Sequence, residues 1–402
     1  MGKILKYLIA VFVGVLLVNG NVFAAEQEGG GSKTDSKSGI DEIGVEAPYA
    51  VLMEATTGEV LYEKDSHTPV PPASVTKIMT MLLIFEALEE GKIKLEDQVT
   101  VSEHAASMGG SQVFLEPYEK QSVDTMLKCI AIASANDACV AMAEYVAGSE
   151  EAFVNQMNER AKSLGMKNTH FVNCNGLDAE GHKFSAYDVA LMSRELLIKH
   201  PQVHGYCTKW MDVIVHTTSK GSTEFGLSNT NKLIRQYEYC TGLKTGSTSE
   251  AGFCVSATAK KDEMELIAVV MNGETSKSRF RDAVTMLNYG YANYQLYQDR
   301  EEQREPLHEI SVTGGVQTKV QPVYQEKFSC LLKNGENISE VEKKLELPET
   351  LSAPIENGQE IGKLLYYHGE RKIGEIANVA GESIEAAKYL DYVKRVWLAW
   401  MM

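Results

Sequence analysis

The first 44 positions change abruptly from apolar to polar. Lys3 and Lys6 precede an apolar run that ends at Val18, and Val22-Phe23-Ala24 supplies small residues at the −3 and −1 positions of a cleavage site. This order is typical of a secretory signal peptide, expected at 1–24. A retained membrane anchor is the alternative, but the run is shorter than the ~20 residues that cross a bilayer.

The next segment, 25–44, has almost no apolar side chains, so it cannot bury enough surface to offset the entropy of ordering. This predicts a disordered linker between the membrane and the folded part. Beyond it, alternating and apolar runs predict two β-hairpins, one from Ala50 with its turn at Thr57-Gly58, the other over 252–259 and 264–271.

The sequence between the hairpins is mostly helical in pattern. Residues 75–90 are apolar nearly all round and stop before Gly91, which predicts a buried helix with a glycine cap. Ser122, Ser149 and Ser185 are expected to cap further helices, the last in a capping box with Asp188. Strands at both ends and helices between them predict an α+β domain over 45–300, with an antiparallel sheet packed on a helical cluster.

An acidic run at 299–306 marks a boundary in the chain. The segment 301–380 is rich in Val, Thr and short runs punctuated by Gly, which predicts a small β-sandwich-like domain. No catalytic constellation is evident in it.

The end of the chain, 381–402, predicts an amphipathic helix with aromatic and aliphatic residues on one face and charged residues on the other. Tryptophans beside basic residues favour a helix lying on a membrane surface, where an indole ring is buried and its N–H stays hydrated. Docking on the protein's own domain is the alternative. The apolar face comprises Ala386, Leu390, Val393, Trp397 and Trp400.

Charge and cysteine content narrow the function. The formal net charge of −16 argues against nonspecific nucleic-acid binding, which needs clustered Lys and Arg. The seven cysteines show no Cys-x-x-Cys spacing, and Pro201 interrupts any helix that would bring His200 and His204 together. We expect no metal, at least one thiol outside intrachain disulfides, and several buried thiols.

The first candidate for chemistry is the pair Ser74 and Lys77, at the start of the apolar helix. A serine there has its backbone N–H at the positive end of the helix dipole, where a developing oxyanion is favoured. Residue i+3 lies on the same face, so the Lys77 amine can serve as the base if the site lowers its pKa. Alone, the pair is also compatible with a helix cap and an exposed lysine.

Two further motifs complete a site for acyl transfer. Ser134 can pass a proton to a leaving amine, and Asn136 can hold a substrate amide. Lys244 supplies a second cation that lowers the Lys77 pKa and attracts a substrate carboxylate, to which Thr245 donates a hydrogen bond. Gly246 leaves room for a substrate backbone to align beside a strand. Each motif alone is more often a turn or a strand end; the three together indicate one active site.

These motifs resemble those of the low-molecular-mass penicillin-binding proteins with D,D-carboxypeptidase activity. The resemblance spans about Ala47 to Tyr291 and is looser in the β-domain and the terminal helix. It implies a β-lactamase/transpeptidase-like fold for the first domain. It rests on Pro72–Thr80, Ala133–Ala138, Asn175–Leu177 and Thr241–Gly246.

The resemblance also implies roles for particular groups. The backbone N–H groups of Ser74 and Ser247 would form the oxyanion hole, and Arg279, in a loop at 276–279, would lie near the substrate. Ser247 stands where many relatives have histidine or tyrosine, and Thr230 where some have an arginine. These departures bear on substrate preference and rate more than on reaction class.

The resulting hypothesis is a serine D-Ala-D-Ala carboxypeptidase. It would act on peptidoglycan stem peptides at the outer face of the cytoplasmic membrane, without a cofactor, and bind β-lactams as covalent inhibitors. A β-lactamase is the first alternative, but no Glu-x-x-Leu-Asn run lies between Asn136 and Lys244. A non-enzymatic wall-binding module would not need a nucleophile paired with a base. D,D-endopeptidase activity uses the same residues.

Overall fold

The computed structural model describes residues 43–219 and 221–401, so the predicted signal peptide and all but the end of the predicted linker lie outside the described residues. Its centre is a five-stranded antiparallel sheet in the order β2-β1-β9-β8-β7. Both predicted hairpins, β1–β2 and β8–β9, are confirmed. The strands are β1 Tyr49–Glu54, β2 Val60–Lys64, β7 Cys240–Thr248, β8 Gly252–Lys261 and β9 Met264–Gly273.

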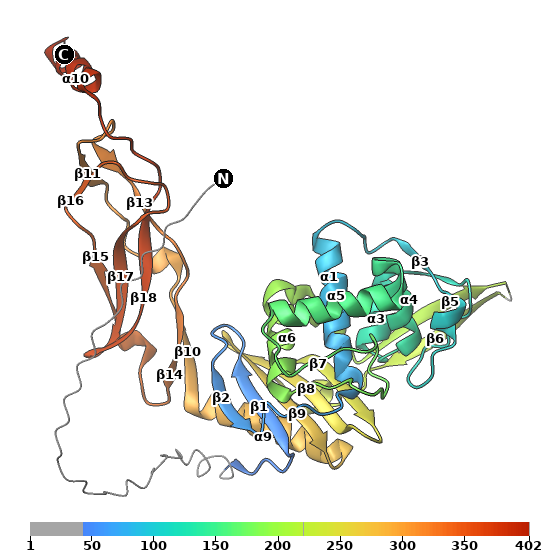
Figure 1. Ribbon diagram of the computed structural model, residues 1–402. Helices are drawn as coiled ribbons and strands as arrows, with labels where there is room; N and C mark the ends of the chain where they lie inside the picture. The colour runs from blue at the N-terminus through green and yellow to red at the C-terminus, as the bar shows by residue number, and fades with distance from the viewer. Residues whose placement is uncertain (1–42, 220, 402) are drawn as a thin grey trace, which may run out of the picture.

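The sheet is covered on both faces (Figure 1). Alternate residues of β9 divide between two cores, because successive side chains of a strand point to opposite faces. Leu266, Ala268 and Val270 join the core under helix α9, whereas their neighbours join the core under a cluster of helices. The helices are α1 Lys77–Glu89, α2 Glu103–Ala106, α3 Val123–Ala131, α4 Asn136–Ala147, α5 Glu150–Ser163, α6 Ala186–Lys199, α7 His204–Cys207, α8 Leu233–Gln236 and α9 Ser276–Asn293. The predicted α+β class is confirmed.

The predicted helix caps are present. Ser122, Ser149 and Ser185 each accept a hydrogen bond from the backbone N–H three residues later. The Asp188 carboxylate does not complete a capping box by accepting from the Ser185 N–H; it accepts from the Asn168 N–H at 2.7 Å. It thereby ties the start of α6 to the segment before it.

Sequence analysis missed a third hairpin, which lies between α7 and α8 in the chain. β5 (Met211–Thr218) pairs with β6 (Gly221–Ser228), and β3 (Gln98–Thr100) pairs with β4 (Lys120–Ser122). The two pairs are linked by His216 Nδ1, 2.8 Å from the buried Glu119 carboxylate. The β-branched run at 213–218 favours a strand, but it was read as part of a helical region.

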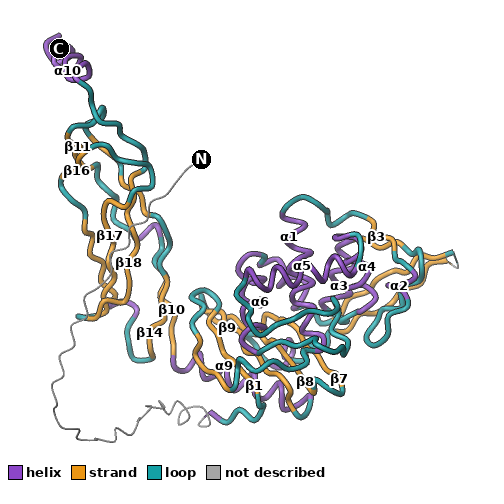
Figure 2. Tube along the Cα trace, viewed as in Figure 1, coloured by secondary structure: helices purple, strands orange, loops and turns teal. Residues whose placement is uncertain are grey.

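The second part of the chain is an elongated β-structure beside the first (Figures 1 and 2). Its sheets have the orders β10-β14, β12-β11-β16 and β13-β18-β17-β15. Asp299, at its beginning, is buried and accepts hydrogen bonds from Arg304, Lys343 and Tyr366. The strands are β10 Tyr294–Gln298, β11 Ile310–Thr313, β12 Lys319–Val320, β13 Pro322–Tyr324, β14 Ser329–Lys333, β15 Val341–Glu346, β16 Thr350–Ser352, β17 Glu360–His368 and β18 Arg371–Ala380.

The terminal helix α10 (Tyr389–Met401) projects from the far end of this β-structure (Figure 1). It begins later than expected, because 382–388 run as extended chain: Ile384 pairs with Ile355, and Ala386 with Gly315. Ala386 therefore does not belong to the helical face. The apolar residues of α10 are exposed, with Trp400 81% exposed. Among the described residues, no helix has the length and apolarity to cross a membrane.

All seven cysteines are free thiols, and five of them are buried. This confirms the expectation of small buried apolar residues within helices and strands. Burial raises the pKa of Cys139 and Cys207 to about 12 and of Cys254 to about 11.

Candidate active site

Ser74 lies in a short 3-10 turn, Ala73–Thr76, that leads directly into α1. The turn begins with an unusual backbone: Ala73 has φ +49°, a left-handed conformation that side chains rarely adopt. Ser74 itself is half-buried. The serine is thus presented at the helix start, as the sequence predicted, although the regular helix begins three residues after it.

Lys77 is fully buried beside the serine. Its Nζ lies 2.9 Å from Ser74 Oγ and 2.7 Å from Asn136 Oδ1, and it also contacts the Asn175 carbonyl oxygen. Burial lowers the pKa of Lys77 below its usual 10.5, because the charged amine is desolvated. A neutral amine at this distance can accept the serine proton.

Lys244 lies within β7 and is also buried, with its Nζ 2.8 Å from Ser134 Oγ and 2.9 Å from the Thr245 carbonyl oxygen. Burial, and then the positive charge of Lys77, lower the pKa of Lys244 well below 10.5. Ser134 has φ +61°. This backbone, between α3 and α4, aims the hydroxyl at the lysine.

Asn136 is the first residue of α4 and is held by the loop between α2 and β4. Its backbone N–H donates to the Ser111 carbonyl at 2.7 Å, and its Nδ2 donates to the Gly109 carbonyl at 2.7 Å. The next residue, Asp137, accepts hydrogen bonds from the Val113 and Leu115 N–H groups. The side chain of Asn136 therefore joins Lys77 to this loop.

The strand β7 brings the third motif against the turn that carries Ser74. A Cβ on Gly246 would lie 2.7 Å from the Ser74 nitrogen, so glycine is required by the close approach of β7 to the turn that carries Ser74. The sequence predicts a different role for this glycine, which is to leave room for a substrate backbone beside the strand. Thr245 Oγ1 lies 2.7 Å from Thr230 Oγ1, which places Thr230 beside the third motif. Ser247 is exposed.

Arg279 was expected in a loop, but it lies in the first turn of α9. Thr275 and Ser278 cap this helix reciprocally, a hydroxyl pair without the acidic residue that usually marks a capping box. Arg279 is buried and donates to the carbonyl oxygens of Gly246 at 2.8 Å and Cys254 at 3.1 Å. The guanidinium thus braces the end of β7 beside the site.

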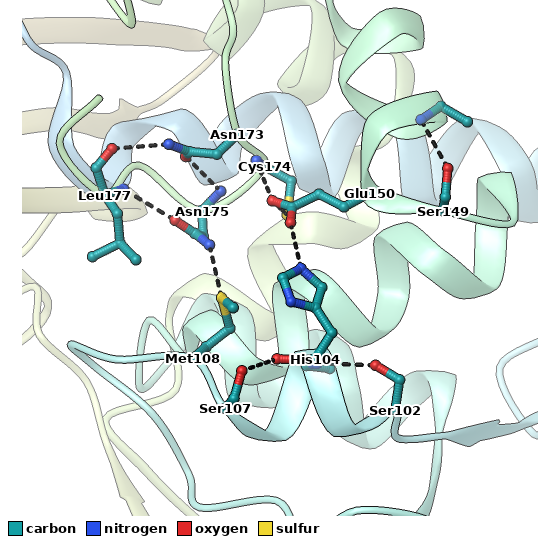
Figure 3. Close-up of polar contacts among 12 residues, drawn as sticks. Ser102, His104, Ser107, Met108, Ser149, Glu150, Asn173, Cys174, Asn175 and Leu177 are labelled. Atoms are coloured by element: carbon teal, nitrogen blue, oxygen red, sulfur yellow. Dashed lines mark hydrogen bonds and ion pairs between the residues drawn. The ribbon is translucent and has the colours of Figure 1, made fainter. Parts of the chain in front are cut away.

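The loop 173–177 contains the motif Asn175–Leu177, to which sequence analysis assigned no chemical role, and it is held by side-chain hydrogen bonds (Figure 3). The Asn173 side chain accepts from the Gly176 N–H at 2.7 Å and donates to the Leu177 carbonyl at 2.9 Å. Glu150 accepts from the Cys174 N–H and also lies 3.0 Å from His104 Nε2. This loop contacts Lys77 through the backbone carbonyl of Asn175, so no pattern of side chains could have revealed the contact.

The site's residues therefore come from α1 and the turn before it, the start of α4 and the connection that precedes it, the 173–177 loop and β7. A buried amine next to a hydroxyl suits proton abstraction, and a second buried amine beside a serine and a threonine suits a carboxylate-terminated ligand. Among the described residues, no group of three or more His, Cys, Asp or Glu side chains is arranged to hold a metal ion.

Comparison with known proteins gives the same chemistry. Residues 34–275 match the D-alanyl-D-alanine carboxypeptidase family model, and 292–386 match the C-terminal domain of penicillin-binding protein 5. The D-alanyl-D-alanine carboxypeptidase DacF of Bacillus subtilis is 44% identical over 92% of this chain and 93% of its own. Penicillin-binding protein 5 of Haemophilus influenzae, a solved structure, is 30% identical, with a TM-score of 0.73 over 85% of this chain and 98% of that one.

A further solved structure is penicillin-binding protein D2 of Listeria monocytogenes in its ampicillin-bound form. It is 30% identical, with a TM-score of 0.51 over 61% of this chain and 97% of that chain. The predicted fold, a transpeptidase-like domain followed by a small β-domain, is confirmed by these matches.

Proposed function

The chain belongs to the D-alanyl-D-alanine carboxypeptidase family and is a hydrolase of that class, and we propose that it works through an ester on Ser74. The observation that carries this proposal is the 2.9 Å separation between Ser74 Oγ and the buried Lys77 Nζ. Because burial lowers the Lys77 pKa, the neutral amine that acts as a base forms at lower pH than in an exposed lysine.

The reaction begins when Ser74 Oγ attacks the carbonyl carbon of the penultimate D-alanine while Lys77 takes the hydroxyl proton. The N–H groups of Ser74 and Ser247 stabilise the oxyanion. Lys244 and Thr245 bind the terminal carboxylate. Ser134 passes a proton to the leaving amine, the C–N bond breaks, and D-alanine departs. Water then hydrolyses the ester and regenerates Ser74.

In this scheme Asn136 orients the substrate amide, and Gly246 and Arg279 position β7. The substrate is a peptidoglycan stem peptide ending in D-Ala-D-Ala, and a β-lactam acylates the same serine. The ampicillin-bound Listeria relative supports the second point. D,D-endopeptidase cleavage remains an alternative use of this site, because a cross-link presents the same bond type.

The proposal extends to the location and the parts of the chain. A cleaved signal peptide at 1–24 and a linker at 25–44 would export the catalytic domain at 45–300. The β-domain at 301–380 would then connect it to the terminal helix, with α10 resting on the outer face of the cytoplasmic membrane. The exposed apolar side chains of α10, together with the exposed Lys394, support this arrangement, whereas Arg395 donates to the carbonyl oxygens of Gly315 and Val316.

The central experiment incubates the protein, without 1–24, with a peptide ending in D-Ala-D-Ala and with a fluorescent penicillin. We expect released D-alanine and a stable covalent label, both lost in Ser74→Ala. Ser66→Ala, which removes a buried hydroxyl bonded to Glu63, is the matched control and should behave as the parent. A parent that neither releases D-alanine nor retains label would refute the proposal; rapid turnover of the label would favour a β-lactamase.

The anchor is tested by sedimentation with liposomes that contain anionic lipid. We expect the full chain to sediment with them and a chain ending at Lys388 to remain in solution. Trp397→Ser/Trp400→Ser should partition as the truncated chain does, since the indoles supply buried area. Equal partitioning of all three would contradict the membrane role.

A further inference from the structure

The peptide unit between Ala73 and Ser74 has two functional ends. Its N–H is the proposed oxyanion donor, and its carbonyl oxygen accepts a hydrogen bond from Thr76 Oγ1 at 2.8 Å. A peptide unit is planar and stiff, so fixing the direction of the carbonyl also fixes the direction of the N–H. The orientation of the oxyanion donor therefore depends on what holds this carbonyl.

The unit is in a conformation that needs support. The Ala73 φ of +49° is a left-handed conformation that persists only where surrounding structure imposes it. Two glycines allow the approach: a Cβ on Gly176 would lie 2.0 Å from the Ala73 oxygen, and one on Gly246 would lie 2.7 Å from the Ser74 nitrogen. The glycines admit the unit into this space, but they supply no side-chain hydrogen bond to it.

A buried histidine, His182, sets the direction of the Thr76 hydroxyl. His182 Nδ1 accepts a hydrogen bond from the Val172 N–H at 3.0 Å, so the hydrogen of the neutral ring resides on Nε2. Nε2 lies 2.9 Å from Thr76 Oγ1 and donates to it. With its oxygen accepting from the histidine, the threonine hydroxyl hydrogen points at the Ala73 carbonyl. The donor and the acceptor are thus assigned for each hydrogen bond from the Val172 N–H to the Ala73 carbonyl.

The surroundings keep the ring in one form. His182 is 2% exposed and packs edge-on against the rings of Phe171 and Phe184, which also contact each other. Burial, and then the nearby His170, lower the pKa of His182 to about 4. The ring is therefore neutral around pH 7, and its tautomer is set by a backbone group.

We propose that His182, acting through Thr76, orients the Ala73–Ser74 peptide and is a positioning residue for acylation of Ser74. Neither side chain contacts the Ser74 hydroxyl or Lys77 among the hydrogen bonds of the site, so the effect is transmitted through the peptide plane. The inference rests on the proposed oxyanion role of the Ser74 N–H.

The test measures the acylation rate constant with a fluorescent penicillin, counted per labelled site, together with the melting temperature. Thr76→Val keeps the shape of the side chain and removes its hydroxyl, and His182→Phe suits the aromatic surroundings and removes the ring nitrogens. We expect each to slow acylation about 10- to 100-fold, because a displacement near 1 Å costs about 100-fold in rate and complete loss of an oxyanion donor costs about 100- to 1000-fold. Thr76→Ser, which keeps the hydroxyl, should stay within about threefold of the parent.

A double variant separates positioning from general destabilisation. If both residues act through one chain of hydrogen bonds, Thr76→Val/His182→Phe acylates no more slowly than the slower single variant. Acylation at the parental rate in labelled Thr76→Val, or losses that multiply in the double variant, would overturn the inference. If Thr76→Val does not fold, the acylation rates of Thr76→Ser and His182→Phe are compared instead. Equal slowing of acylation in these two variants would overturn the inference.

An error in the proposed role of Ser74 as nucleophile would give a different result from an error in the positioning role of His182 and Thr76. If Ser74→Ala still forms the covalent label, the nucleophile assignment is wrong whatever the Thr76 variants do. If Ser74→Ala loses the label while Thr76→Val acylates normally, only the positioning role is wrong. Ser66→Ala again serves as the control for removal of a buried hydroxyl.

Discussion

Adding a single methyl group at Gly246 tests whether β7 sets the position of the nucleophile. The Cβ of Gly246→Ala would lie 2.7 Å from the Ser74 nitrogen and 3.0 Å from both the Val75 nitrogen and the Ala73 Cβ. Ordinary contact begins at 3.4 Å, so the strand and the turn must separate by 3.4 − 2.7 = 0.7 Å. Because a displacement near 1 Å costs about 100-fold in rate, we expect acylation to slow about 10- to 100-fold.

The assay is stopped-flow acylation by a fluorescent penicillin, with thermal unfolding measured in parallel. Gly246 has no left-handed φ, so alanine adds no backbone strain there, and overpacking should cost about 1–3 kcal/mol of stability. Gly226→Ala is the matched control, since Gly226 also lies in a strand but has open space where its Cβ would be. Parental acylation by a folded Gly246→Ala protein would refute the dependence of Ser74 on this contact.

Three other changes have defined outcomes. Acylation should rise with pH through a midpoint below 10.5, because burial lowers the Lys77 pKa and only the neutral amine is a base; a midpoint at or above 10.5 would contradict this. Lys244→Met should abolish D-alanine release yet raise Tm at pH 7, because burial lowers the pKa of this lysine, so its charged form is less stable in the folded protein than in the unfolded chain. An unchanged or lower Tm would count against that sign. Asp299→Asn should lower the unfolding free energy of the β-structure by about 3–5 kcal/mol while penicillin acylation stays parental, since three donors lose a buried carboxylate. Burial raises the pKa of Asp299, but its donors outweigh this and hold it below 3.8, so the parent should lose this stability only as pH falls below that value; calorimetry across pH 2–7 would show it.

Much of the fold was predictable because local signals and long-range packing agree. The hairpin β8–β9 and the buried helix α1 have apolar runs that fit their burial on every side. The caps at Ser122 and Ser149 follow from a hydroxyl before an apolar period. Where the signals are weak, prediction failed: β5 exposes Met211, Val213 and Val215, so its alternation does not mark a buried face.

The side chains that the sequence proposes for the site lie close together in the structure, but their geometry could not be predicted. Ser74, Lys77 and Lys244 carry chemistry that only a few residue types supply, so their spacing is informative. Asn175 acts through its carbonyl oxygen, which every residue has. His182 stands in no motif, and its link to Ser74 passes through Thr76 and a peptide plane, so only three-dimensional contacts reveal it.

The free thiols have a practical consequence for following the protein's motions. Cys129, Cys139, Cys174, Cys207 and Cys254 are buried in different elements, and their raised pKa values keep them protonated at neutral pH. A thiol reagent can reach each one only when its own element opens. Without any added probe, the rate of alkylation at each cysteine therefore records how often that part of the catalytic domain opens.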